Sequence, residues 1–250
     1  MTPPRLLVIQ PSDSDPAGRL ADWLTAAGAD IHIVAPAREP LPALDDYQGV
    51  VCLGGEMGAL DDREHPWLSD VRLLLSKAVA TKTPTLAICL GAQLLAAATG
   101  GQVRRGDKGP EVGVLLVAKR DTAARDPLFA ELPLTPDVLQ FHHDEITLLP
   151  PGAELLASSP RYANQAFRVG SVGYGVQFHI ETTPEIVLKW AELAPDEAAM
   201  ARPGQLEPDA LAEAHITLAE VWQPFAQRFV QLSAGELAPV AGSFRSLPLV

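Results

Sequence analysis

The sequence predicts an α/β protein in which a mostly parallel sheet is flanked by helices on both faces. In the first half of the chain, short apolar runs alternate with longer segments whose apolar residues recur at helical spacing. Strands that alternate with helices pair in parallel, since each helix carries the chain back to the same edge of the sheet. The 250 residues are also enough to bury a large core. We therefore expect a three-layer arrangement of helices, sheet and helices.

Local patterns place each element of the first half. Turn residues at Asp15-Pro16 open the first helix, which carries Leu20, Trp23 and Leu24. Between 67 and 79, apolar residues share one face of a second helix. In chain order, the expected elements are a strand at 6–9, the helix after Asp15-Pro16, strands at 31–34 and 50–53, a helix at 67–79, a strand at 85–88 and a helix at 92–98.

The second half has short strands separated by turn residues and ends in helices. Helical spacing resumes from Pro184, and Pro224 should divide the last helical region into two helices. We expect one α/β domain over 1–195 and a C-terminal helical extension over 196–250 that packs on it, with a loosely ordered tail from Ala238. The expected strands are 112–117, 138–141, 155–157, 165–169 and 174–178.

Composition restricts the class of partner. The 31 acidic residues exceed the 19 basic ones, which gives a net charge of −12 and argues against nucleic acid or an anionic membrane surface. The apolar run at 6–9 is too short for a signal peptide or a membrane span. Only Cys52 and Cys89 are present, so a disulfide framework is not indicated and a cytoplasmic location is expected.

One cysteine stands where an apolar strand gives way to small residues and then a helix. Ala87 and Gly91 lie two positions either side of Cys89 and leave room for a sharp turn. Such a strand–turn–helix junction lifts a reactive side chain clear of the backbone, and the helix N-terminus favours the thiolate. Cys89 is therefore the candidate nucleophile. A free cysteine is also commonly a buried core residue, which is our interpretation of Cys52 inside its strand.

A cysteine nucleophile needs a base, and the base needs a group that fixes its tautomer. The strand at 174–178 leads into His179-Ile180-Glu181. In an extended chain, residues two apart point to the same side, so Glu181 can accept the imidazole N–H that is not directed at sulfur. The alternative is a hydrogen-bonded histidine without a catalytic role.

Glycines that follow a strand let backbone N–H groups approach a reacting oxygen closely. Gly54-Gly55 come directly after the strand at 50–53. The N–H groups of Gly55 and of Leu90, the residue after the nucleophile, can together hold the oxyanion of a tetrahedral intermediate. A glycine turn without any ligand role is the alternative.

The three segments together resemble class I (triad-type) glutamine amidotransferase domains, especially stand-alone domains similar to the glutaminase part of GMP synthase. The resemblance spans roughly residues 5 to 192 and implies a flavodoxin-like fold. It rests on Gly54-Gly55-Glu56-Met57, Cys89-Leu90-Gly91-Ala92-Gln93 and Gln177-Phe178-His179-Ile180-Glu181.

The resemblance also implies chemical roles for individual residues. Cys89 would form a γ-glutamyl thioester, His179 would act as general base and acid, and Glu181 would orient the imidazole. Gly55 and Leu90 match the oxyanion donors, and no cofactor is implied. Met57, Gln93, His143 and Asp144 match positions beside the substrate.

Three positions depart from the family pattern. Ala87 and His143 stand where the family usually has glycine, and Ile180 stands where it usually has proline. None of these removes a catalytic group, but His143 can narrow or re-polarise the substrate side of the pocket. His142, His143 and Asp144 also suggest a metal site. The sequence has no further cluster of ligands at the spacing of a metal site, which argues against this interpretation.

Three functions remain open. The first is a glutamine amidotransferase whose ammonia goes to a separate synthetase or acceptor, because the chain has no phosphate-loop signature. The second is a γ-glutamyl hydrolase acting on a small γ-glutamyl amide or peptide. The third is a non-catalytic regulatory protein of the same fold. The oligomeric state is not predicted.

Overall fold

A computed structural model describes residues 2–240 of the chain, around an eight-stranded central sheet. Its strands are β1 (Arg5–Ile9), β2 (Asp30–Val34), β3 (Gly49–Cys52), β4 (Thr85–Ile88), β7 (Ala118–Lys119), β10 (Glu154–Ser158), β11 (Ala166–Val169) and β12 (Gly173–Val176). They lie in the order β2-β1-β3-β4-β12-β11-β10-β7. The first five of these pair in parallel, and the last three continue the sheet antiparallel. The predicted mostly parallel sheet is confirmed.

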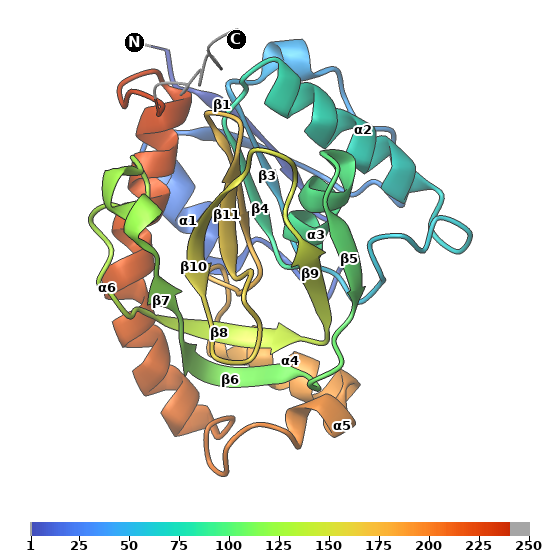
Figure 1. Cartoon of the computed structure of the whole chain (residues 1–250), viewed down its shortest axis with the longest axis vertical. Coiled ribbons are helices and arrows are strands. Elements are labelled where there is room, and N and C mark those ends of the chain that lie inside the picture. The colour runs from blue at the N-terminus through green and yellow to red at the C-terminus, as the bar shows by residue number, and fades with distance from the viewer. Residues whose placement is uncertain (1, 241–250) are drawn as a thin grey trace, which may run out of the picture.

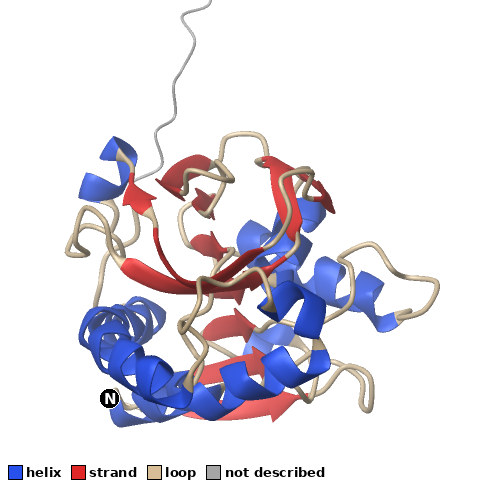
Figure 2. Ribbon diagram, turned by 90° about the horizontal axis from the view of Figure 1, so that it is seen from below, coloured by secondary structure: helices blue, strands red, loops and turns tan. Residues whose placement is uncertain are grey.

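Helices cover both faces of this sheet (Figures 1 and 2). They are α1 (Gly18–Ala26), α2 (Trp67–Ala80), α3 (Leu90–Ala98), α4 (Pro184–Leu193), α5 (Pro195–Ala198) and α6 (Pro208–Ser233). Alternate residues of β1 point to opposite faces. Leu6 and Val8 belong to a buried cluster that includes residues of α1, α4 and α6. Leu7 and Ile9 belong to a second cluster, with α2 and α3. The predicted three layers are therefore present.

Two small strand pairs lie outside the central sheet, in Figure 1 one across its lower end and one to its right. They are β5 (Gln102–Arg105) with β9 (Asp144–Leu148), and β6 (Glu111–Leu116) with β8 (Asp137–His142), both antiparallel. The sequence does not predict β5, β7 or β9, because these strands are short or largely polar and make no apolar run. The tight connection from β8 to β9 brings His142, His143 and Asp144 to this end of the sheet.

The last helix is continuous, so the prediction that Pro224 divides this region is wrong. Pro224 lies inside α6. Proline removes one helical hydrogen bond, but burial of the side chains around it holds the helix together. Trp222 and Phe225 are buried against the sheet layer, and Trp222 Nε1 donates to the Asp137 carbonyl at 2.9 Å.

Several element boundaries also differ from the prediction. The strand expected at 174–178 ends at Val176, and α3 begins at Leu90 rather than at 92. Residues 241–250 of the expected tail lie outside the described part of the chain.

None of the helices within residues 2–240 is both long and apolar enough to cross a membrane.

Candidate active site

The backbone at Cys89 has the conformation of a sharp strand-to-helix turn. Cys89 lies between β4 and α3 with φ of 50° and ψ of −109°, a combination outside the regions that non-glycine residues ordinarily adopt, so the turn is strained. The first N–H groups of α3, beginning with Leu90, have no partner inside the helix and point toward this turn. Cys89, which the pattern of small residues predicts as the nucleophile, therefore stands at the N-terminus of a helix.

Gly91 allows the turn to pack against the neighbouring strand. A Cβ atom added to Gly91 would lie 2.2 Å from the Cys52 carbonyl oxygen, a contact that backbone atoms cannot relieve without movement. We expect Gly91→Ala to lower the free energy of unfolding by about 3 kcal/mol, because it overpacks this junction. Urea denaturation followed by circular dichroism measures the loss. Gly152→Ala separates the steric effect from backbone strain: a Cβ there would meet nothing within 4 Å, so any loss in that variant comes from the φ of 73° alone.

His179 and Glu181 face one another as predicted. The Nδ1–H of His179 donates to Glu181 Oε1 at 2.6 Å, and Glu181 Oε2 accepts the Ile180 N–H at 2.9 Å. The strand does not lead straight into this segment: β12 ends at Val176, and the His179 N–H donates to the Leu139 carbonyl at 2.8 Å. Both side chains are almost completely buried.

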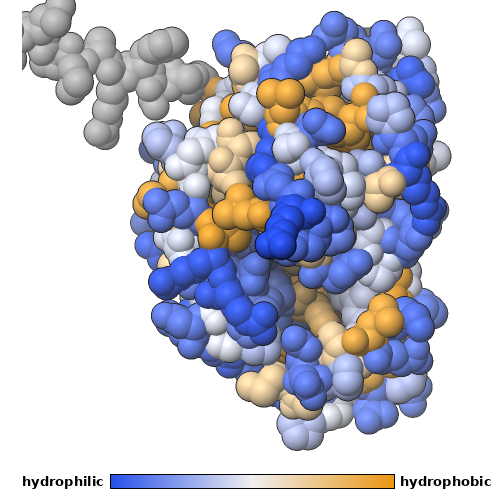
Figure 3. Space-filling view, turned by 90° about the vertical axis from the view of Figure 1, so that its right-hand side faces the viewer, coloured by the Kyte–Doolittle hydropathy of each residue, from blue (hydrophilic) through white to orange (hydrophobic). Residues whose placement is uncertain are grey.

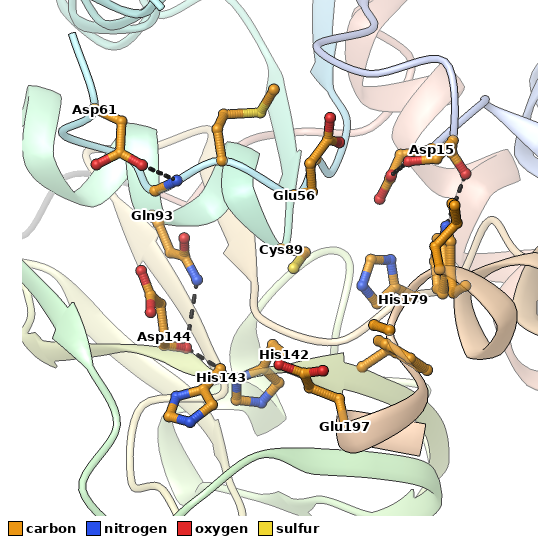
Figure 4. A pocket seen from close by; sticks show the side chains of 18 of the residues that line it. Asp15, Glu56, Asp61, Cys89, Gln93, His142, His143, Asp144, His179 and Glu197 are labelled. Atoms are coloured by element: carbon orange, nitrogen blue, oxygen red, sulfur yellow. Dashed lines mark hydrogen bonds between the residues drawn. The ribbon is translucent and has the colours of Figure 1, made fainter. Parts of the chain in front are cut away.

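The surroundings of His179 favour its protonated form. Burial by itself lowers the pKa of His179, but the Glu181 carboxylate and the neighbouring Cys89 outweigh burial and hold that pKa well above its usual value. The Cys89 sulfur and the His179 ring lie beside each other in Figure 4. The Trp190 ring packs on the imidazole, with ring centroids 4.6 Å apart. The arrangement can therefore support a thiolate–imidazolium pair.

Two buried glutamines connect Cys89 to the opposite wall of the site. Gln177 Nε2 donates to the Cys89 sulfur at 3.7 Å. Gln93 Nε2 lies 3.3 Å from Gln177 Oε1 and 3.4 Å from the Asp144 carbonyl oxygen. The predicted substrate residues Gln93 and Asp144 thus lie together, and Gln177 is a link to which the sequence alone gives no role.

The predicted oxyanion donors come from two junctions that lie side by side, Gly55 from the loop after β3 and Leu90 from the start of α3. Gly55 lines the pocket beside Cys89, and a Cβ added there would come within 2.7 Å of Met57 Sδ and 2.9 Å of a Leu90 methyl carbon. Met57 lines the pocket as well, whereas Leu90 is buried behind it. A side chain at position 55 would therefore force Met57 and Leu90 to move.

His143 carries a polar atom without a partner. Its Nδ1 is buried and has no hydrogen-bond partner within residues 2–240. By contrast, the preceding His142 is held on both sides, by the Asp144 carbonyl oxygen at 2.9 Å and by Glu111 Oε2 at 3.2 Å. Such an unpaired buried atom costs free energy unless a ligand satisfies it.

One pocket of about 560 Å³ is lined by the predicted site residues Cys89, His179, Gly55, Met57, Gln93, His143 and Asp144 (Figure 4). Gln93, Asp144 and Asp61 lie on one side of Cys89 in that view, and His179 and Asp15 on the other. Figure 3 shows a hollow in the lower half of the face that it presents, with hydrophilic side chains around much of the rim. Within residues 2–240, no group of three or more His, Cys, Asp or Glu side chains is placed to hold a metal ion.

Asp15 and Trp190 also line the pocket, although the sequence alone assigns them no part in it. Local patterns in the sequence mark Asp15 only as a residue at the start of a helix, and Trp190 only as part of an apolar helix face. Neither has a local signal for the site, because each reaches it through the packing of a distant element.

The chain matches a family model and is similar in sequence to proteins of known name. A family model described as "Glutamine amidotransferase class-I" matches residues 19–187. Gamma-glutamyl peptidase 4 of Arabidopsis thaliana is 30% identical over 146 residues, which are 58% of this chain and 57% of that protein. The match thus spans under three-fifths of the length of this plant relative. A glutamine-hydrolyzing GMP synthase subunit of Saccharolobus solfataricus is 32% identical over 155 residues, 62% of this chain and 77% of that one.

Solved structures share the fold over nearly the whole chain. A glutamine amidotransferase from Thermotoga maritima superposes with a TM-score of 0.79 at 28% identity, covering 92% of this chain and 97% of that one. A glutamine amidotransferase from Methylobacillus flagellatus gives a TM-score of 0.77 at 26% identity and covers 97% and 98% of the two chains.

Proposed function

We propose, since this chain belongs to the class-I glutamine amidotransferase family, that it hydrolyses the side-chain amide of glutamine and releases ammonia. The observation that carries the proposal is the arrangement of Cys89, His179 and Glu181. The cysteine stands on a strained turn beside an imidazole whose other nitrogen donates to Glu181 at 2.6 Å. This is the geometry of a nucleophile, its base and the group that orients the base.

In the first half of the reaction, the Cys89 thiolate attacks the side-chain carbonyl carbon of glutamine. The N–H groups of Gly55 and Leu90 hold the oxyanion that forms. The C–N bond then breaks, and the departing nitrogen takes a proton from the His179 imidazolium and leaves as ammonia. A γ-glutamyl thioester remains on Cys89.

In the second half, water attacks the thioester carbon. Neutral His179 takes a proton from that water, the C–S bond breaks, and glutamate leaves. Cys89 is released as a thiolate and His179 is again an imidazolium, so protons and electrons balance over the cycle. Glu181 accepts the Nδ1–H of His179 and stabilises the imidazolium.

The substrate's amino-acid group would bind on the wall opposite His179. Gln93 and Asp144 lie together there, and His143 Nδ1 supplies a buried atom that lacks a partner within residues 2–240. Met57 would cover the side chain of the substrate, since it lines the pocket next to Gly55.

The ammonia would pass to a separate synthetase or acceptor protein. One relative is named as part of a glutamine-hydrolyzing synthase of more than one subunit. We further propose that residues 1–195 form the glutaminase domain and 196–250 an extension packed on it; the burial of α6 in the same core as α1 and α4 supports that packing. Two free cysteines support a cytoplasmic location.

The test is an assay of the purified protein with glutamine and a panel of γ-glutamyl amides. We expect glutamine to yield equimolar glutamate and ammonia. Weak turnover of glutamine beside rapid turnover of another amide would contradict the first proposal.

That second outcome would support a γ-glutamyl hydrolase. Two observations favour keeping it as a candidate. Relatives that align with this chain are named as gamma-glutamyl peptidases. A pocket of about 560 Å³ also falls in the size range of sites that hold molecules well beyond a single amino acid. The two functions share the same chemistry and differ in the leaving group.

A further inference from the structure

A buried carboxylate that the proposed reaction does not use lines the active-site pocket. Asp15 lies in the loop between β1 and α1 and is only 7% exposed. Ser14 Oγ donates to Asp15 Oδ2 at 2.6 Å, and Ser12 Oγ in turn accepts the Ser14 N–H at 3.1 Å. The loop thus holds this carboxylate in one orientation. Burying a charge is costly, so a carboxylate kept here calls for a reason.

Asp15 and His179 meet across a glycine. A Cβ added to Gly54 would lie 2.7 Å from Asp15 Oδ1 and 3.2 Å from His179 Cε1. Only the absence of a side chain at this position lets both groups approach the same point. Figure 4 shows Asp15 and His179 on the same side of Cys89.

The loop is also fixed to the segment that carries the base. Where the loop enters α1, the Arg19 N–H donates to the Glu181 carbonyl oxygen at 2.9 Å. Trp190, which packs on the His179 ring, donates its indole N–H to the Ser14 carbonyl oxygen at 2.7 Å. Asp15 therefore keeps its place relative to His179 through two independent contacts.

We propose that Asp15 is a positioning residue whose negative charge stabilises the His179 imidazolium from the side of the ring that Glu181 does not contact. The inference rests on the proposed function in one respect, that His179 is the base for Cys89. Glu181 accepts the Nδ1–H, whereas Asp15 acts through space near Cε1. An imidazolium held in this way keeps the neighbouring thiolate stable.

The effect should depend on pH with a defined sign. Burial raises the pKa of Asp15 to about 6; the His179 charge and the Ser14 hydroxyl oppose that rise, and Glu181 and Glu56 add to it. Those side chains come from the β12–α4 connection, from the loop after β3 and from Asp15's own loop. Above a pH of about 6 Asp15 is ionised and supports the imidazolium. As the pH falls through that value it becomes neutral, and the support is lost.

The experiment compares the wild type with Asp15→Asn between about pH 5 and pH 8, on either side of the pKa of Asp15. The readout is the rate of Cys89 alkylation by iodoacetamide, located by mass spectrometry, together with turnover of γ-glutamyl substrates. At about pH 7.5 we expect Asp15→Asn to be slower by about tenfold, because a nearby charge at partial burial changes ion-pair stability by this order. At about pH 5 the two proteins should react at nearly the same rate, since Asp15 is then largely neutral.

Asp13→Asn is the matched control. Asp13 lies two residues away in the same loop, but it is exposed and pairs with Arg38. Its replacement removes the same charge and should leave the ratio to wild type near one at every pH.

Ser14→Ala is a second variant, and its expected effect is a shift of the pH dependence to higher pH. The Ser14 hydroxyl lowers the pKa of Asp15, so its loss should move the midpoint of the pH dependence above about 6. This variant tests the inference even if Asp15→Asn fails to fold.

An Asp15→Asn ratio that stays constant across this pH range would overturn the inference, since a purely structural role gives no convergence at low pH. A wild-type protein that hydrolyses no γ-glutamyl substrate, but whose alkylation follows the expected pattern, would contradict the proposed function and leave the inference standing.

Discussion

Replacing Cys89 with alanine should abolish turnover, with a loss of about 10⁴-fold or more, because the other cysteine, Cys52, is completely buried and does not line the pocket. The variant should also lose covalent labelling by an electrophilic glutamine analogue. Glutamate release and the intact mass of the labelled protein measure the two effects. The fold should survive, since the change removes one atom beside the pocket.

Cys52→Ala is the matched control for this prediction. Cys52 is completely buried in β3, and burial raises the pKa of its thiol to about 12, so it holds no thiolate near neutral pH. We expect labelling and turnover to persist in this variant. Labelling that survived in Cys89→Ala and vanished in Cys52→Ala would instead identify Cys52 as the nucleophile. A Cys89→Ala protein that kept its full biological activity would support the non-catalytic alternative.

Replacing His179 with alanine should lower turnover by about 10³- to 10⁴-fold, because ammonia departure needs its proton and hydrolysis of the thioester needs it as a base. Cys89 labelling should slow as well, since the imidazolium that stabilises the thiolate is gone. Steady-state rates and labelling rates, measured on the same preparation, check both effects.

Glu181→Gln tests the role of His179 while leaving its imidazole in place. The Glu181 carboxylate raises the pKa of His179, so its removal lowers that pKa. The alkaline limb of the pH–rate profile should therefore move to lower pH. His32→Ala is the control, because His32 lies on β2 and is not part of the pocket lining. Equal losses in His32→Ala and His179→Ala, with both proteins folded, would contradict the assignment of the base.

Much of this site follows from the sequence because its signals are local. Gly54-Gly55, Cys89 and His179-Ile180-Glu181 each follow an apolar strand segment of the parallel sheet, and the ends of such strands meet at one edge. The departures have physical reasons. Pro224 stays inside one helix because tertiary burial outweighs a lost hydrogen bond. The strands β5 and β9 carry no apolar run, so periodicity does not reveal them.

The sequence by itself determined the layered fold and the residues that belong to the candidate nucleophile, base and orienting carboxylate. These depend on periodicity, glycine placement and spacing within single segments. Only the tertiary structure decided that Gln177 reaches the Cys89 sulfur and that His143 keeps an unpaired nitrogen among the described residues. It alone also set Asp15 across Gly54 from His179. Contacts of this kind depend on how distant elements pack, and no local pattern in the chain encodes the distance between them.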